Sequence, residues 1–95
     1  MPDGEINMVR DNPALSRFEL DADGHVAFNE YTLEGNVLTL RHTEVPKALE
    51  GRGIGSRLAK EVLDLARSRG LKVVPRCPFI NSWIGKHPDY ADLVA

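Results

Sequence analysis

The chain has 95 residues, a length that allows one compact domain with one hydrophobic core and excludes two. Hydrophobic residues make up 42% of the chain, and 14 acidic residues against 12 basic ones give a formal net charge of -2. This balance predicts neither a nucleic-acid-binding surface nor attraction to an anionic membrane, so any anion site must be local. We expect a single domain over residues 1–95.

The cysteine and histidine content restricts the chemistry further. Cys77 is the only cysteine, which excludes an internal disulfide, and the three histidines lack the spacing of zinc ligands. The N-terminus has neither the basic nor the apolar segment of a secretion signal, and no run of about 18 apolar residues occurs. We therefore expect a reducing, cytoplasmic location, no metal ion and no membrane partner.

Short strands are predicted at the start of the chain. Residues 6–10 form a candidate strand, which the turn-forming residues 11–13 would stop. Apolar and charged side chains alternate over residues 15–20, as is typical of a half-buried strand. Residues 21–24 predict a hairpin turn.

Two longer strands follow. Residues 26–33 are rich in residues that favour strands, and residues 34–36 supply a turn. Residues 37–45 predict the next strand, which Pro46 ends because proline has no N–H to donate to the sheet. The first half of the chain therefore predicts an antiparallel meander of about four strands.

The periodicity then changes to that of an amphipathic helix. Apolar residues recur at three- and four-residue steps, namely at Ile54, Leu58, Val62, Leu65 and Ala66. Gly70 is placed to end this helix in a left-handed conformation, and residues 71–75 resume as a strand. A right-handed crossover predicts that this strand lies parallel to residues 37–45, and short helices broken at Pro88 are predicted over residues 79–95. The fold class is α+β.

Three glycines lie between a strand and the helix, at Gly51, Gly53 and Gly55. The start of a helix presents unpaired N–H groups and the positive end of the helix dipole, and a glycine-rich approach lets a phosphate reach them. Arg52 and Arg57 can add positive charge. The segment lacks the Lys-Ser or Lys-Thr of a P-loop and the Gly-x-Gly-x-x-Gly of a dinucleotide site. The alternative is that these glycines only turn the chain.

The segment Val45-Pro46, followed by Gly51-Arg52-Gly53-Ile54-Gly55-Ser56-Arg57-Leu58, resembles the acyl-CoA-binding motif of GCN5-related N-acetyltransferases (GNATs), Gln/Arg-x-x-Gly-x-Gly/Ala. Gly53 and Gly55 match its small positions, whereas Glu50 stands where Gln or Arg is usual. Residues 42–46, 73–80 and 87–90 extend the resemblance over most of the chain, to a minimal single-domain subfamily of small acetyltransferase-like proteins. The resemblance implies a GNAT-like fold and, without the additional N-terminal helices of larger members, an open acceptor site.

The resemblance also implies acetyl-CoA as the cofactor and a primary amine as the acceptor. Main-chain N–H groups of the glycine loop and helix start would bind the pyrophosphate, and the pantetheine arm would lie where the two parallel strands part. The main chain near Glu44 and Val45 would meet the pantetheine and thioester, with the Val45 N–H as a candidate oxyanion donor. The predicted cofactor-binding residues are Glu44, Val45, Glu50, Gly51, Arg52, Gly53, Ile54, Gly55, Ser56 and Arg57.

Cys77 precedes Pro78, a residue favoured at the first position of a helix, so Cys77 is predicted to be a helix N-cap. A thiol there faces the positive helix terminus, which favours the thiolate. In the resembled subfamily the positions of His42 and Cys77 carry a proposed catalytic pair, which acts through an acetyl-cysteine or by base-assisted direct transfer. The alternatives are that Cys77 only fills space near the cofactor and that His42 is an ordinary strand histidine.

Two further functions stay open. One is an acyl-CoA-binding module without turnover, an alternative that is kept open by Glu50, the missing acceptor-framing segment and the lack of an obvious carboxylate base. The other is a protein-interaction domain on the same fold, which would have no affinity for CoA. Phe79 and Trp83 are predicted to be core residues rather than walls of the cofactor groove.

Overall fold

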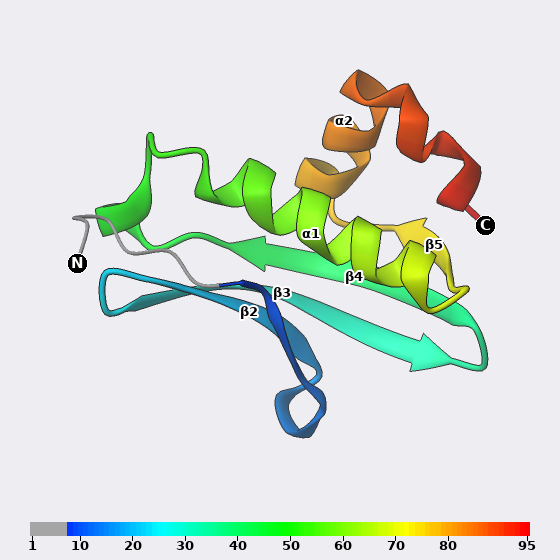
Figure 1. The fold of residues 1–95 in the computed structure, drawn as a ribbon, viewed down its shortest axis with the longest axis horizontal. Coiled ribbons are helices and arrows are strands. Elements are labelled where there is room, and N and C mark those ends of the chain that lie inside the picture. The colour runs from blue at the N-terminus through cyan, green and yellow to red at the C-terminus, as the bar shows by residue number, and fades with distance from the viewer. Residues whose placement is uncertain (1–7) are drawn as a thin grey trace.

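A computed structural model describes residues 8–95, which form one five-stranded sheet of order β1-β2-β3-β4-β5 (Figure 1). The strands are β1 Arg10–Asn12, β2 Arg17–Ala22, β3 His25–Glu34, β4 Val37–Glu44 and β5 Lys72–Pro75. The helices are α1 Ile54–Ser68 and α2 Pro78–Lys86, with 3-10 helices η1 Pro13–Leu15, η2 Lys47–Leu49 and η3 Pro88–Leu93. Strands β1 to β4 pair antiparallel and β5 pairs parallel to β4, so the predicted α+β fold is confirmed.

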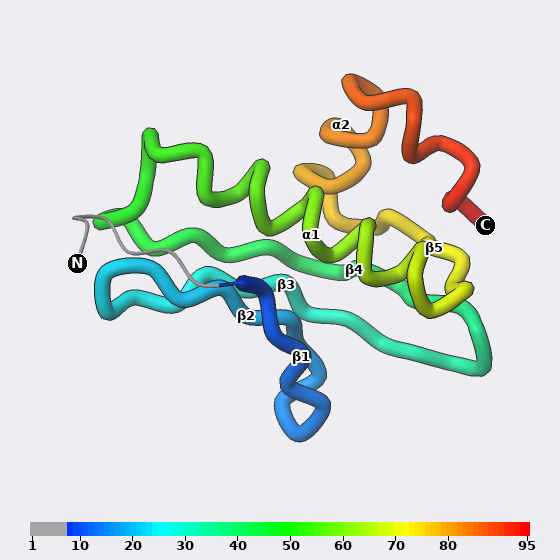
Figure 2. Tube along the Cα trace, in the orientation of Figure 1, coloured from blue at the N-terminus to red at the C-terminus, as the bar shows by residue number. Residues whose placement is uncertain are grey.

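The beginning of the sheet differs from the prediction. Residues 6 and 7 lie outside the described residues, and β1 contains Asp11 and Asn12, which were predicted to form a turn. The turn comes later because Pro13 starts the short helix η1, whose end at Ser16 has a left-handed φ of 51°. Strand β2 accordingly begins at Arg17 rather than at residue 15. In Figure 2 the trace of β1 and η1 lies at the edge of the sheet away from α2 and the C-terminus.

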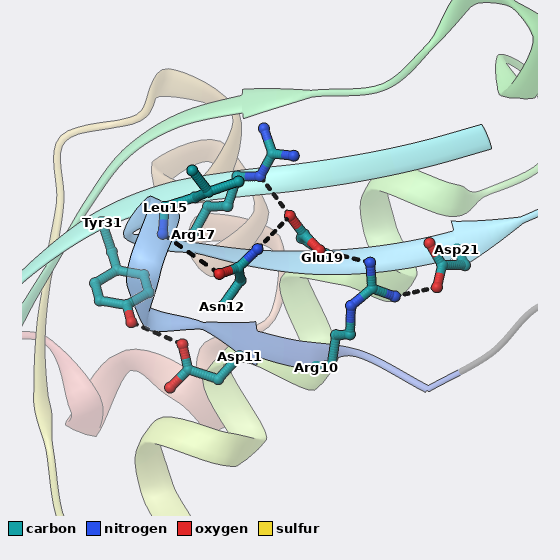
Figure 3. Close-up of polar contacts among 8 residues, drawn as sticks. All are labelled: Arg10, Asp11, Asn12, Leu15, Arg17, Glu19, Asp21 and Tyr31. Carbon is teal, nitrogen blue, oxygen red and sulfur yellow. Dashed lines mark hydrogen bonds and ion pairs between the residues drawn. The ribbon is translucent and has the colours of Figure 1, made fainter.

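A buried carboxylate holds β1 against β2 (Figure 3). Glu19 is 3% exposed and accepts hydrogen bonds from Arg10 at 2.5 Å, Asn12 at 3.1 Å and Arg17 at 2.5 Å. Burial alone would raise the pKa of Glu19, but the hydrogen bonds from Arg17, Asn12 and Arg10 outweigh it, and the pKa lies below its ordinary value of 4.5. Every oxygen of this buried group is therefore partnered.

The core lies between α1 and one face of the sheet. Helix α1 buries the residues that its periodicity predicted except Leu65, which is only partly buried. Gly70 follows the helix, and its φ of 69° matches a left-handed helix end. The buried side chains of α1 are Ile54, Leu58, Ala59, Val62, Leu63 and Ala66. Each large aliphatic side chain buried in this way stabilises the fold by roughly 1.5–3 kcal/mol. No helix within residues 8–95 combines the length and the apolar content needed to cross a membrane.

A β-bulge in β4 decides which face its last residues occupy. Leu40 pairs with Tyr31 and His42 with Glu30, which leaves Arg41 between them without a partner on β3. Beyond the bulge Thr43 pairs with Asn29, on the buried face that Leu40 also uses. His42 therefore lies on the opposite face of the sheet.

Strands β4 and β5 part at the same place. Their parallel pairing runs from Val37 opposite Lys72 to Leu40 opposite Pro75. The Cys77 N–H adds one more bond, to the Leu40 carbonyl at 2.9 Å, and the chain then enters α2. The remainder of β4 pairs only with β3 in the part of the chain that the structure describes, which agrees with the predicted divergence of the two strands.

Candidate functional site

The three glycines before and within α1 are needed for two different reasons. Gly51 and Gly53 have φ angles of 81° and 71°, which side chains rarely tolerate. Gly55 has an ordinary helical backbone, but a Cβ added there would meet Phe79 Cζ at 3.0 Å. The first two glycines therefore shape the loop, and the third allows α2 to approach the start of α1.

The start of α1 has no capping side chain among the described residues. Gly53 is the N-cap, and no side chain of the described residues caps the helix or places an acid in its first turn. The first hydrogen bond of the helix runs from the Arg57 N–H to the Gly53 carbonyl at 3.0 Å. The N–H groups of the preceding first-turn residues, Ile54 to Ser56, thus lie at the positive end of the dipole without a capping side chain, an arrangement that suits a phosphate.

Both arginines predicted to add positive charge already pair with carboxylates. The Arg52 guanidinium contacts Asp23 in the turn between β2 and β3, and Arg57 Nε donates to Glu61 Oε2 at 2.6 Å. The main chain of the loop is therefore the principal donor for a phosphate, with each arginine available only through exchange with its carboxylate.

Two other predicted cofactor-binding residues have local roles. Glu50 is exposed at the end of η2, where its N–H donates to the Lys47 carbonyl at 3.2 Å. Ser56 Oγ accepts a hydrogen bond from Trp83 Nε1 at 2.8 Å, which ties α2 to the first turn of α1. Trp83 is buried as predicted, whereas Phe79 is 43% exposed, so its prediction as a core residue is wrong. The Phe79 ring covers Gly55 at the surface instead.

Cys77 is the N-cap of α2 and Pro78 its first residue, which confirms the predicted geometry. The side chain is 3% exposed, and its Sγ lies 3.2 Å from Thr43 Oγ1. The Cys77 carbonyl accepts the first hydrogen bond of the helix, from the Asn81 N–H at 3.0 Å. The thiol thus lies at the end of the β4–β5 pairing, beside the point where the strands part.

The structure does not bring His42 to Cys77. The His42 side chain is 56% exposed, and its Nε2 lies 2.9 Å from Glu44 Oε1 on the same face of β4. No hydrogen bond between His42 and Cys77 occurs within residues 8–95, because the bulge turns Thr43 rather than His42 toward the thiol. Its role as the base stays a prediction. Val45, the candidate oxyanion donor, follows β4 and packs partly buried against the core.

Sequence reasoning missed Asn29 and Thr43. Asn29 is completely buried, and its Nδ2 donates to Thr43 Oγ1 at 2.8 Å and to the His42 carbonyl at 3.3 Å. An asparagine among the strand formers Val26, Phe28, Tyr31 and Thr32 was the available signal. No group of three or more side chains suited to a metal ion is found in residues 8–95.

A cavity of about 410 Å³ lies on the outer side of α1. It is lined by Met8, Val9, Arg57, Glu61, Asp64, Leu65 and Ser68. Arg57 is its only predicted site residue, and neither Cys77 nor a glycine of the loop borders it.

Comparisons with known proteins agree on one family. The sequence model of a family described as GCN5-related N-acetyl-transferase matches residues 17–93. Protein NATD1 of Gallus gallus is 40% identical over 52 residues, which cover 55% of this chain and 47% of that protein. Protein NATD1 of Xenopus tropicalis is 38% identical over 66 residues, which cover 70% of this chain and 60% of that protein. The chain thus spans about half the length of the first of these relatives.

A solved structure supports the same assignment. The NMR structure of a GCN5-like protein from Staphylococcus aureus superimposes with a TM-score of 0.69 at 28% sequence identity, and the match covers 100% of this chain and 91% of that chain. The family match extends over most of the chain and includes the glycine loop, the start of α1 and Cys77. The chain belongs to the GCN5-related N-acetyltransferase family.

Proposed function

We propose that the chain binds acetyl-CoA and transfers its acetyl group to a primary amine, with Cys77 as the acetyl acceptor in the first step. The observation that carries this proposal is the start of α1, which has no capping side chain and follows two glycines in the left-handed conformation. Helix α1 connects β4 to β5, the two parallel strands whose pairing stops at Leu40. A phosphate-binding helix start beside two parting strands suits an extended phosphorylated cofactor.

The residues present fit this cofactor. The N–H groups of residues 52–56 would hold the pyrophosphate. Residues 41–44 of β4 and the following Val45 do not pair with β5, and their main-chain groups suit the amides of the pantetheine arm. Acetyl-CoA supplies a thioester, whose carbonyl the Val45 N–H would polarise. The glycines keep side chains away from this path.

Cys77 acts on the thioester carbonyl as a thiolate. Its sulfur forms a bond to the acetyl carbon, the bond from that carbon to the CoA sulfur breaks, and CoA leaves as a thiolate that takes up a proton. The amine then attacks the acetyl group on Cys77, loses one proton and releases the thiol. His42 is proposed as the base that receives a proton, and in this role its ring must leave Glu44 and move from the opposite face of the sheet toward the acetyl group.

An acceptor screen that detects released CoA tests this function. Small amines, polyamines, lysine-containing peptides and peptides with a free N-terminus form its arms, because the residues of the site do not select among them. We expect CoA release that depends on one amine class, and an acetyl group on Cys77 when the amine is omitted. Binding of acetyl-CoA without release in any arm would support the non-catalytic module instead, and turnover in Cys77→Ala at the normal rate would support direct transfer.

The cofactor site itself is tested with two glycine variants. Gly55→Val adds a side chain where Phe79 approaches to 3.0 Å and where phosphate would bind, whereas Gly85→Val adds one on α2 where nothing lies within 4 Å. Calorimetric titration with acetyl-CoA should show a loss of affinity on the order of tenfold or more for Gly55→Val and little change for Gly85→Val. Equal affinities would contradict the proposed site, and no affinity in the unaltered chain would favour the interaction domain.

A further inference from the structure

We propose that Asn29 and Thr43 are positioning residues that present a hydroxyl proton to the Cys77 sulfur. The inference rests on the proposed function, since it assigns these side chains a role in the reaction of that thiol. The three side chains come from three elements, β3, β4 and the N-cap of α2, and they form one chain of hydrogen bonds. We call the hydrogen-bonded side chains of Asn29, Thr43 and Cys77 the relay.

The direction of the relay follows from what each group can donate. The His42 carbonyl can only accept, and it lies 3.3 Å from Asn29 Nδ2, so this contact identifies the amide nitrogen. The same nitrogen lies 2.8 Å from Thr43 Oγ1, so the hydroxyl is the acceptor there. Its own proton is then free to point at Cys77 Sγ, 3.2 Å away.

The burial of Asn29 argues against a purely structural role. Asn29 is completely buried, and within the described residues its Oδ1 has no hydrogen-bond partner. An unpaired buried acceptor destabilises the fold, and an apolar residue would fill the same space without this penalty. The amide is therefore better explained by its Nδ2, which sets the orientation of the Thr43 hydroxyl.

A hydroxyl aimed at the sulfur gives Cys77 a hydrogen-bond donor. Sulfur accepts hydrogen bonds weakly as a thiol and more strongly as a thiolate, so the Thr43 proton stabilises the nucleophile and also fixes its direction. The Cys77 N–H bond to Leu40 already fixes the main chain, and the relay adds control of the side chain. The proton stays on Thr43, and no covalent bond is made or broken in the relay.

The test uses the single cysteine of the chain, because any thiol alkylation by iodoacetamide must then occur at Cys77. Thr43→Val removes the hydroxyl with little change of shape, Thr43→Ser retains it, and Thr39→Val makes the same exchange elsewhere on β4. We expect the alkylation rate at neutral pH to fall on the order of tenfold in Thr43→Val, to recover in Thr43→Ser and to stay unchanged in Thr39→Val. Asn29→Leu should lower the rate severalfold, because the hydroxyl loses its fixed direction.

The sign of the effect separates positioning from simple loosening. A variant that only loosened the structure would expose a thiol that is 3% exposed here, and alkylation would become faster. An unchanged or faster rate in folded Thr43→Val would overturn the relay. Alkylation requires no acetyl-CoA, so slow alkylation in Thr43→Val together with no acetyl group on Cys77 in the unaltered chain would retain the relay and reject the proposed function.

Discussion

Two polar side chains are buried in the described chain, Glu19 and Asn29, and they differ in how completely they are hydrogen-bonded. Glu19 lies between β1 and β2 with three hydrogen-bond donors around its carboxylate. Asn29 lies between β3 and β4 with its amide nitrogen partnered and its Oδ1 unpaired. One region satisfies its buried polar group fully, and the other leaves part of it unsatisfied.

This difference predicts that Glu19 contributes to stability and that Asn29 contributes to the reactivity of the site. A fully partnered buried charge becomes strongly destabilising when its partners or the charge itself are removed. A partly partnered buried amide contributes little to stability, so its presence is better explained by the group that it orients. We therefore expect changes at Glu19 to unfold the chain more easily and changes at Asn29 to alter the reactivity of Cys77.

The largest effect on stability should come from Glu19→Ala, which removes the acceptor of three hydrogen bonds. It leaves Arg10, Arg17 and Asn12 without their shared acceptor, and because both arginines are partly exposed we expect a loss of about 2 kcal/mol in the free energy of unfolding. Urea unfolding measures this loss. Glu30→Ala is the matched control, since the Glu30 carboxylate forms an ion pair with the half-exposed Arg41 at 3.7 Å, and its loss should be below about 0.5 kcal/mol. Equal losses would contradict the comparison.

A smaller loss is expected when the pH is lowered. The folded pKa of Glu19 lies below its ordinary value of 4.5, so the ionised group stabilises the fold above that value, and the stabilisation is lost as the pH falls through the folded pKa. Urea midpoints should therefore fall on acidification below 4.5, and they should fall less in Glu19→Gln, which cannot titrate there. Glu61 and Asp64, whose pKa values are also lowered, leave a residual decrease in the variant. Parallel decreases in both proteins would exclude a contribution from Glu19.

A smaller effect on stability than that of Glu19→Ala should come from Asn29→Leu, which sharpens the comparison. The substitution loses the hydrogen bonds to Thr43 and to the His42 carbonyl but removes the unpaired Oδ1 and buries more apolar surface. These contributions oppose each other, and we expect a change in the free energy of unfolding below about 1 kcal/mol. The same urea measurement decides this, and a loss as large as that of Glu19→Ala would make Asn29 a structural residue.

Most of the fold was predictable because its signals are local. The helical periodicity from Ile54, the left-handed end at Gly70 and the order Cys77-Pro78 each act within a few residues, and the structure confirms all three. The boundaries of β1 and η1 were not predictable in the same way, since Pro13 both stops a strand and starts a helical turn. The pairing with β2 determines how far β1 extends before the turn begins.

The site was predictable in its main-chain parts and less so in its side chains. The glycines reveal a special backbone directly in the sequence, because only glycine adopts such angles easily. The pairing of Arg52 with Asp23 joins residues 29 positions apart, and no local pattern indicates it. The bulge at Arg41 is also invisible in the alternation of residues 37–45, so Thr43 and Asn29 escaped notice.

The strand register at the bulge determines which side chain of β4 lies beside the Cys77 thiol. If Arg41 paired with Glu30 in a regular ladder, His42 would lie opposite Asn29 and turn inward, and Thr43 would turn outward. The same residues would then place an imidazole instead of a hydroxyl beside Cys77. Strand register, at the point where β5 no longer pairs with β4, thus decides whether a histidine or a threonine lies beside the only cysteine of the sequence.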